Sequence, residues 1–310
     1  MISVVIRAYN EERHIGRLLE GIAQQTLDGV ETILVDSGST DATLEIARRY
    51  PLRVVHIQPD EFTFGRSLNR GIAASQGETI VIASAHVYPV YPDWLERLLA
   101  PLRDPQVALA YGKQRGNAAA KFSEGQIFTR WYPESSDLRQ AHPFCNNANA
   151  AIRRSLWELH PYDESLSGLE DLDWAHWAVG EGYRLAYVAE AEVIHVHDET
   201  PRAVYNRYRR EAMAFKRIFP QEHFGLRDFL RLSLSNILSD LYHAGQQGVL
   251  LRSLGSIFWF RLMQFWGTYQ GYRHLGPLTW QLRQTFYYPR RMESAGEPIS
   301  RNVEPIRYNE

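Results

Sequence analysis

The first hundred residues alternate short apolar runs with amphipathic segments, and this alternation restricts the possible folds more than any other feature. Apolar runs typical of strands lie at Ser3–Ala8, Glu31–Val35, Val54–Ile57 and Thr79–Ala83. The segments between them include the i, i+3, i+4, i+7 spacing of an amphipathic helix, formed by Ile15, Leu18, Leu19 and Ile22. This pattern predicts right-handed strand–helix–strand units, and therefore an α/β fold with a mostly parallel sheet and flanking helices.

The rest of the chain has weaker or different signals. Further strands are predicted at Val107–Tyr111, Asn149–Ile152, Leu185–Val188 and Val193–Val196, whereas Gly112–Pro143 is polar and irregular and predicts a loop or short helices. Pro201 marks a boundary, and three helical patterns follow near 202–218, 225–245 and 249–272. We therefore expect an α/β domain over residues 1–200, a helical region over 201–290 and a flexible tail over 291–310.

Composition excludes several classes of protein. The 310 residues are 45% apolar, which is enough for one large core or two modest ones. The formal net charge of -2 argues against a general affinity for nucleic acid. The single cysteine, Cys145, excludes an internal disulfide framework and a cysteine-based zinc site. With no secretory leader in the sequence, one thiol favours a reducing, cytoplasmic location.

Charge is distributed unevenly along the chain. Residues 202–290 hold 13 basic and 4 acidic side chains, whereas the first 201 residues hold 18 basic and 28 acidic ones. Arg207, Arg209 and Arg210, with Trp259 and Trp266 further along, suit helices that lie on an anionic membrane surface. The alternatives are a packed helical cap and a homodimer interface. Only eight residues separate Arg252 from Arg261, which argues against a spanning helix.

Polar residues follow three of the predicted strands. The first is followed by Tyr9, Asn10 and Glu11, the second ends in Asp36, and the fourth leads into Ser84-Ala85-His86. The carboxyl ends of parallel strands meet at one edge of a sheet, which is where ligands bind in such folds. Tyr9 could stack on a base, and Asp36 could accept a hydrogen bond from a base or ribose. The alternative is that these residues only cap helices. None of these turns has a glycine-rich phosphate motif, which argues against a dinucleotide site.

Six short motifs then occur in a characteristic order. They are Val4–Glu12, Leu34–Asp41, Asn69–Glu78, Asn147–Arg154, Gly168–Ala175 and Val193–His197. Each is weak alone, but together they resemble the family 2 glycosyltransferases with the GT-A fold, and most of all the bacterial rhamnosyltransferase-like enzymes of surface polysaccharide synthesis. The resemblance implies transfer of a sugar from a nucleotide donor to a glycan or lipid-linked acceptor, with inversion at the anomeric carbon. Such an enzyme would work in the cytoplasm, with a peripheral position on the inner face of the plasma membrane as a further expectation.

The resemblance also implies roles for individual residues. A hydroxyl that attacks an anomeric carbon needs a base, and the leaving diphosphate needs positive charge. Asp171 corresponds to the family's base, and Glu170 would orient the acceptor or support the site. The alternative for Asp171 is an N-terminal helix cap. Candidate donor contacts are Arg7, Ala8, Tyr9, Glu11, Asp36, Arg66, Ser84 and Ala85.

The sequence departs from the family at the metal-binding motif. Ser84 and His86 stand where the family places the two carboxylates of an Asp-any-Asp motif, so two hard oxygen ligands are missing. His197 matches the family's late metal or diphosphate ligand. Three alternatives remain open: His86 and His197 share a divalent cation, Mn²⁺ or Mg²⁺; a protonated His86 meets the diphosphate directly; or the protein is a non-catalytic sugar-nucleotide or glycan binding module.

A second departure concerns the donor. Many relatives have an acid after Asp36 that reads a uracil, and here that position is Ser37. The replacement favours a dTDP- or GDP-linked sugar over a UDP-linked one.

Overall fold

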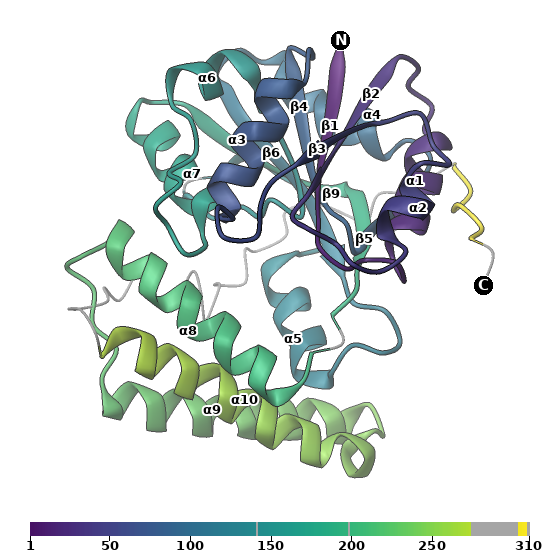
Figure 1. Cartoon of the computed structure of the whole chain (residues 1–310). Helices are drawn as coiled ribbons and strands as arrows, with labels where there is room; N and C mark the ends of the chain where they lie inside the picture. The colour runs from purple at the N-terminus through teal and green to yellow at the C-terminus, as the bar shows by residue number, and fades with distance from the viewer. Residues whose placement is uncertain (141, 198, 274–302, 309–310) are drawn as a thin grey trace.

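The computed structural model describes residues 1–140, 142–197, 199–273 and 303–308 and shows two layers (Figure 1). The first is a nine-stranded sheet with helices on both faces, in the strand order β3-β2-β1-β4-β8-β6-β9-β5, with β7 paired to β9. The second consists of three long helices below the sheet (Figure 1). The α/β fold and the C-terminal helices predicted from the sequence are thus confirmed.

The N-terminal half of the sheet is parallel, as predicted. It contains β1 (Ile2–Ala8), β2 (Val30–Asp36), β3 (Arg53–His56) and β4 (Thr79–Ser84), and the helices between them are α1 (Ile15–Ala23), α2 (Thr43–Ala47) and α3 (Phe64–Ala74). Successive side chains of a strand point to opposite faces, so Val5 enters one apolar core while Val4 and Ile6 enter the other. Covering both faces with helices explains why the central strands β1 and β4 are largely apolar, whereas β3 at the edge is not.

The C-terminal half of the sheet is mixed, which corrects the expectation of a mostly parallel sheet. Strand β8 (Asn149–Arg153) is antiparallel to β4 and to β6 (Val107–Arg115), whereas β9 (Arg184–His195) is parallel to β6. The short strands β5 (Val87–Pro89) and β7 (Asp137–Gln140) are both antiparallel to β9. An apolar run indicates a strand but not its direction, and β9 is one long strand where two short ones were predicted.

The segment predicted to be irregular contains regular structure. It includes the end of β6, helix α5 (Phe122–Trp131) and β7. The remaining elements of the sheet layer are α4 (Trp94–Leu99), the 3₁₀ turn Ala100–Arg103, α6 (Arg154–Leu159) and α7 (Glu170–Gly180).

The helical layer consists of α8 (Pro201–Ile218), α9 (Leu226–Gln246) and α10 (Leu250–Tyr272), close to the predicted ranges. Thr200 caps α8 by accepting a hydrogen bond from the backbone N of Ala203. Helix α10 approaches α8 closely at Gly267, where a Cβ atom would lie 2.4 Å from the carbonyl oxygen of Tyr205. Within the described residues, no helix combines the length and apolar character needed to cross a bilayer.

The end of the chain differs from the flexible tail that was predicted. Residues 291–302 lie outside the described residues, but 303–308 lie against the edge of the sheet (Figure 1). The backbone N of Ile306 donates to the carbonyl of Val90, the hydroxyl of Tyr308 donates to that of Pro89, and the Tyr308 ring packs edge-on against Tyr88. An edge strand has free backbone groups, which explains why this segment finds partners there.

Candidate active site

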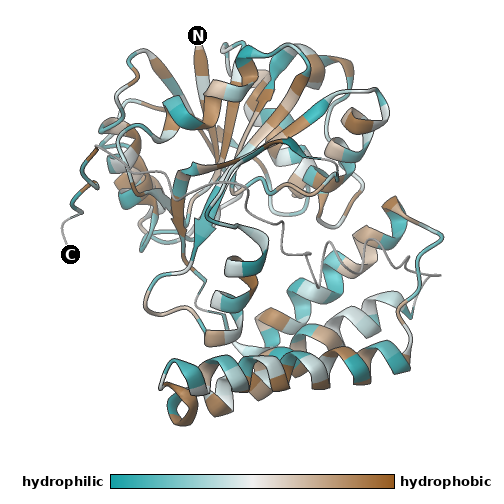
Figure 2. Cartoon of the chain, turned by 180° about the vertical axis from the view of Figure 1, so that it is seen from behind, coloured by the Kyte–Doolittle hydropathy of each residue, from teal (hydrophilic) through white to brown (hydrophobic). Residues whose placement is uncertain are grey.

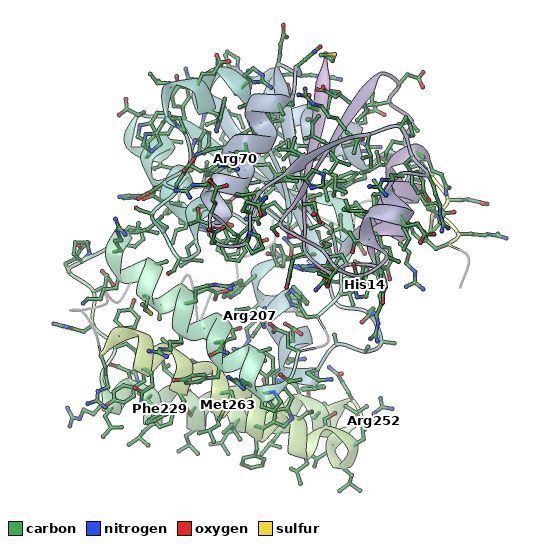
Figure 3. The ribbon with its side chains drawn as sticks, viewed as in Figure 1. His14, Arg70, Arg207, Phe229, Arg252 and Met263 are labelled. Atoms are coloured by element: carbon green, nitrogen blue, oxygen red, sulfur yellow. The ribbon has the colours of Figure 1, made fainter. Side chains whose placement is uncertain are left out.

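A cavity of about 430 Å³ lies between the carboxyl end of the sheet and helix α8. Side chains from both layers line it. Those from the sheet layer include Arg7, Ser84, His86, Glu170, Asp171 and His197, and those from α8 are Arg207, Arg210 and Glu211. Figure 3 shows Arg207 between α8 and the sheet. The cavity is thus where an open α/β sheet ordinarily binds its ligand.

Two neighbouring carboxylates at the start of α7 have different partners. Glu170 accepts a hydrogen bond at 2.8 Å from Nη1 of Arg7, which forms a mostly buried ion pair. Asp171 instead accepts one from the backbone N of Asn147 at 3.0 Å. Burial, with a contribution from the charge of Glu170, raises the pKa of Asp171 to about 7. A carboxylate that exchanges its proton near neutral pH is well suited to act as a general base.

Positive charge lies beside this pair. The guanidinium groups of Arg7 and Arg210 lie over the same aromatic ring, that of Phe64, at 5.0 Å and 4.6 Å from its centroid. The ring comes from the first turn of α3, and Arg210 comes from α8. The two layers therefore bring two cations to the cavity, where an anionic group could bind.

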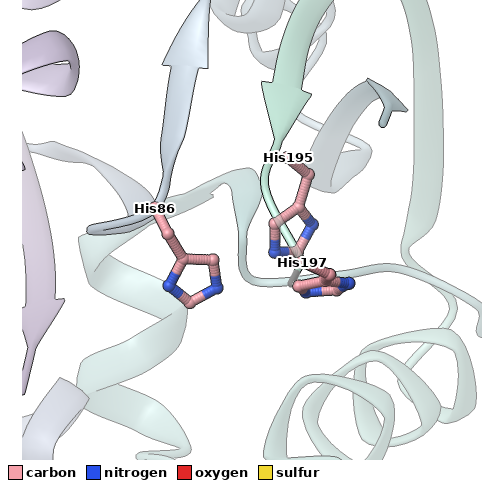
Figure 4. A group of neighbouring side chains, drawn as sticks. All are labelled: His86, His195 and His197. Carbon is pink, nitrogen blue, oxygen red and sulfur yellow. The ribbon is translucent and has the colours of Figure 1, made fainter. Parts of the chain in front are cut away.

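Three histidines gather at the carboxyl end of β9 (Figure 4). The ring centroids of His195 and His197 are 4.0 Å apart, and His86 lies 5.0 Å from the first and 5.7 Å from the second. One nitrogen of each ring can be chosen so that all three lie within 4.8 Å of one another. Three imidazoles at this spacing form a donor set that a divalent cation could share.

Each imidazole is oriented by an oxygen atom on its Nδ1 side. Nδ1 of His86 lies 2.7 Å from Glu11 Oε1, that of His195 lies 2.6 Å from Gln114 Oε1, and that of His197 lies 2.7 Å from Glu124 Oε1. These oxygens accept hydrogen bonds, so they favour the tautomers with a lone pair on Nε2. Nε2 of His195 is buried and has no hydrogen-bond partner. Outer oxygen partners of this kind are typical of histidines that bind metals.

Burial also keeps two of these rings neutral. It holds the pKa of His195 and of His197 well below the usual value, with nearby cationic groups adding to the effect. A metal ligand must be an unprotonated imidazole, so the low pKa suits metal binding.

Two acidic side chains lie beside the histidines. Glu124, from α5, and Glu199 both form ion pairs with Arg207, at 2.9 Å and 2.7 Å. Burial raises the pKa of each carboxyl group, whereas the charge of Arg207 lowers it. Arg207 already forms an ion pair with each of these two acids, so the three histidines are the better candidate for a cation site. The position of Arg207 in the cavity wall corrects the expectation that it contacts lipid.

The other two arginines of that prediction do not form a lipid-facing group either. Arg210 lines the cavity, and Nε of Arg209 is buried. Arg209 also belongs to the segment of α8 against which α10 packs, since a Cβ atom at Gly271 would lie 2.5 Å from its carbonyl oxygen.

The structure brings together seven of the predicted site residues. Arg7, Glu11, Ser84, His86, Glu170, Asp171 and His197 line the cavity. Ala8 and Ala85 lie at adjacent strand ends, where the backbone N of Ala85 donates to the carbonyl of Arg7 and that of Ser37 donates to Ala8.

Besides Ala8 and Ala85, three further predicted residues lie outside the cavity lining. The carboxylate of Asp36 is buried and accepts hydrogen bonds from the backbone N of Gly38 and Ser39 in the turn after β2, so it does not cap a helix. Tyr9 is exposed. Arg66 forms an ion pair with Glu164 at 2.7 Å.

Several cavity residues were not predicted. His195 had a usable signal, because residues two apart in a strand face the same side and His197 was already a candidate. Glu124, which does not line the cavity but holds the ring of His197, had none, since it lies in the segment expected to be a loop or short helices. Asn147, whose backbone holds Asp171, lies in one of the six motifs but has no titratable group.

Comparison with known proteins identifies the family. The sequence profile of glycosyl transferase family 2 matches residues 3–159, just over half of the chain. The chain is 31% identical over 196 residues to O-antigen chain rhamnosyltransferase WbaN of Salmonella anatum, which covers 60% of this chain and 62% of that protein. It is 28% identical over 219 residues to O-antigen chain rhamnosyltransferase RfbN of Salmonella typhimurium, and this match covers 67% of this chain and 70% of that protein. The match to the first relative thus spans less than two thirds of that protein.

Solved structures show the same fold. The mannosyltransferase PcManGT from Pyrobaculum calidifontis, solved with GDP-Man and Mn²⁺, has a TM-score of 0.58 at 22% identity, covering 87% of this chain and 84% of that one. Glucosyl-3-phosphoglycerate synthase from Mycobacterium tuberculosis, solved with Mn²⁺, UDP and glucosyl-3-phosphoglycerate, has a TM-score of 0.53 at 25% identity, covering 73% and 83%. The motifs, the sheet with its cavity and these matches agree, and the chain belongs to glycosyl transferase family 2 and has the GT-A fold.

Proposed function

We propose that this protein is an inverting glycosyltransferase of polysaccharide synthesis that moves a sugar from a nucleoside diphosphate donor to a hydroxyl group of a glycan or lipid-linked acceptor. The observation that carries the proposal is the Asp171 carboxylate, which lines the cavity, is buried and has a pKa raised to about 7. Cationic Arg7 and Arg210 line the same cavity, so a proton acceptor and positive charge are available together.

The proposed step assigns one task to each group. Asp171 accepts the proton of the acceptor hydroxyl while that oxygen forms a bond to the anomeric carbon. The bond between the anomeric carbon and the diphosphate oxygen breaks, and its electron pair leaves with the diphosphate. Attack on the face opposite the leaving group inverts the configuration. Arg7 and Arg210 stabilise the negative charge of the leaving group, and Glu170 positions Arg7 through their ion pair.

The three histidines fit a divalent cation, because their outer oxygen partners and the unpartnered Nε2 of His195 suit metal binding. We propose that His86, His195 and His197 would hold it, and that such a cation would supply positive charge near the diphosphate. Imidazole ligands favour Mn²⁺ over Mg²⁺, which prefers oxygen. Both solved structures described above contain Mn²⁺.

The donor and the location are proposed on other grounds. Ser37 in place of a second acid favours a dTDP- or GDP-linked sugar, and the two Salmonella relatives are named as rhamnosyltransferases. Ala8, Tyr9, Asp36, Arg66 and Ala85 remain predicted donor contacts that rest on the family resemblance. A cytoplasmic enzyme on the inner face of the plasma membrane would meet both a nucleotide sugar and a lipid-linked acceptor.

The test of the base is the Asp171→Asn variant. It should bind the donor nucleotide normally and transfer sugar roughly 10²–10⁴-fold more slowly, the usual contribution of a general base. Asp173→Asn is the matched control, since Asp173 lies on the same helix but outside the cavity lining. Near wild-type transfer by Asp171→Asn would show that Asp171 is not the base. Donor binding by the wild type without transfer or hydrolysis would favour the binding-module alternative.

The cation site has a separate test that does not need the reaction. Titration calorimetry with Mn²⁺ alone should detect binding to the wild type, and His195→Ala should weaken it by roughly 10-fold or more, as expected for loss of one of three ligands. His243→Ala, on α9, is the control. Equal Mn²⁺ affinity in all three proteins would exclude this site.

A further inference from the structure

Exposed hydrophobic side chains are concentrated on two helices. Of the sixteen large hydrophobic residues that are exposed in the described part of the chain, eleven belong to α9 and α10. We call this set the outer apolar face; it consists of Leu226, Leu230, Leu234, Leu238 and Tyr242 on α9 and Leu250, Leu251, Leu254, Phe258, Leu262 and Trp266 on α10. Their exposed fractions range from 36% to 90%, so the other described residues do not bury them.

The two rows lie side by side on the outside of the helical layer. The residues of α9 recur every four positions, so each lies next to the following one in a row that winds gradually around the helix. Helix α10 returns beside α9, and the rings of Phe229 and Trp266 are 5.5 Å apart. The buried sides of both helices, including Asp240 and Arg261, face the interior of the layer. Hydrophobic segments recur along the helices at the bottom of Figure 2.

The charges around this face have one sign. The exposed charged residues of α9 and α10 are Arg227, Arg231 and Arg252, and Figure 3 shows Arg252 at the outer edge of the layer. The two acidic residues of these helices, Asp228 and Asp240, have side chains that are only 16% and 0% exposed. The surface therefore combines apolar side chains with cations, the composition of a helix that lies in the interface of an anionic membrane.

A second copy of the chain fits this face less well. Two copies related by a two-fold axis would bring the same surface together, and the arginines of one would meet those of the other. Anionic lipid headgroups are complementary to the same arginines, while the leucines, Phe258 and Trp266 would enter the boundary between headgroups and acyl chains.

We propose that the outer apolar face of α9 and α10 binds to the surface of a lipid bilayer that contains anionic lipids. The helices would lie in the plane of the interface and would not cross it. The face points away from the sheet, whereas the cavity lies on the other side of the helical layer, between α8 and the sheet (Figure 1). Binding would therefore leave the cavity accessible, and the inference does not depend on the proposed transfer reaction.

The test is sedimentation of the full-length protein with vesicles of phosphatidylcholine alone or with increasing phosphatidylglycerol. We expect the bound fraction to rise with phosphatidylglycerol and to fall with salt. The pair Leu234→Gln and Phe258→Gln should weaken binding roughly 10-fold or more, because each replaces a side chain that would enter the membrane. The matched control is the pair Leu138→Gln and Leu159→Gln, which are exposed leucines of the sheet layer.

The arginines have their own control. Replacing Arg227, Arg231 and Arg252 by Gln should weaken binding to anionic vesicles by roughly 5-fold per residue, whereas the same change at exposed Arg48, Arg103 and Arg139 should not. The proposal is overturned if the wild type stays in the supernatant with anionic vesicles at low salt. It is also overturned if the control substitutions weaken binding as much as the substitutions on the outer apolar face. A dimer in analytical ultracentrifugation that Leu234→Gln and Phe258→Gln dissociate, without vesicle binding, would assign the face to a second copy instead.

Discussion

The helical layer exposes far more large apolar side chains than the sheet layer does, and it also buries a charged pair. In the sheet layer, strands such as β1 and β4 are buried along almost their whole length by apolar residues, and polar groups gather at the carboxyl ends of the strands. In the helical layer, α9 and α10 bury Asn236, Asp240, Arg261, Gln264 and Thr268 and expose a row of leucines. Arg261 donates two hydrogen bonds to Asp240, at 2.7 Å and 2.9 Å, with both side chains almost wholly buried.

Apolar burial stabilises both layers, because α9 and α10 also bury Phe229, Leu232, Ile257, Phe260 and Phe265. The helical layer adds a buried ion pair, which specifies a geometry but is costly if one partner is lost. It leaves much of its apolar surface exposed. The four predictions below test this comparison, beginning with the largest expected effect.

Breaking the buried ion pair should have the largest effect on stability. Asp240→Asn leaves Arg261 as an uncompensated buried charge, and we expect the free energy of unfolding to fall by about 3–5 kcal/mol. Chemical denaturation measured by circular dichroism would give the value. The double variant Asp240→Leu with Arg261→Met removes both charges and should recover most of the loss. A loss under about 1 kcal/mol in the single variant would contradict the view that this pair holds the helical layer.

Removing an apolar side chain from the sheet layer should cost almost as much. Leu18→Ala, in α1, empties a fully buried position and should lower the free energy of unfolding by about 2–5 kcal/mol. Leu159→Ala makes the same substitution at an exposed position and is the control. It should change the free energy of unfolding little. Equal effects of the two variants would show that the contribution of a leucine to stability in this layer does not depend on its burial.

The stability of the protein should depend on pH through Asp171 at the carboxyl end of the sheet, whereas the apolar interior of the sheet does not titrate. Folded Asp171 keeps its proton up to a pH of about 7, whereas in the unfolded chain it loses the proton near its usual pKa of 3.8. The folded state therefore binds more protons between these values, so this group lowers the free energy of unfolding as the pH rises from about 4 to 7. Asp171→Asn should remove that dependence. Transfer should follow the opposite trend and increase through pH 7, because the base acts when ionised.

The smallest effect is expected on the outer apolar face. Leu234→Gln should change the free energy of unfolding by no more than about 0.5 kcal/mol, since the side chain is exposed in the folded protein. The same denaturation experiment as for Leu18→Ala gives a direct comparison of two leucines. A loss as large as that of Leu18→Ala would mean that Leu234 is buried against another part of the chain.

The sequence predicted the fold class and much of the candidate site. The βαβ pattern located β1 to β4, and the six motifs pointed to Glu170, Asp171 and His197. His86 was found at the position of the family's metal-binding motif, and all four residues line one cavity. The sequence did not predict β5 or β7, which are only three and four residues long and have little apolar pattern. It suggested that Arg207 contacts lipid, because the sequence does not show whether a basic residue on a helix is buried or exposed.

By itself, then, the sequence determined the order of strands and helices along the chain, because apolar periodicity follows local backbone geometry, and it determined the family through short motifs at strand ends. Only the tertiary structure decided the antiparallel direction of β8, the grouping of His195 with His86, and the pairing of Arg207 with Glu124 across the two layers. It also decided which side of α9 and α10 is exposed: Asp240 and Arg261 pair inside the layer, whereas most of the leucines, though not Leu232, are exposed. The physical reason is the same in each case. Burial and pairing depend on residues distant in the sequence, and a local pattern carries no record of those partners.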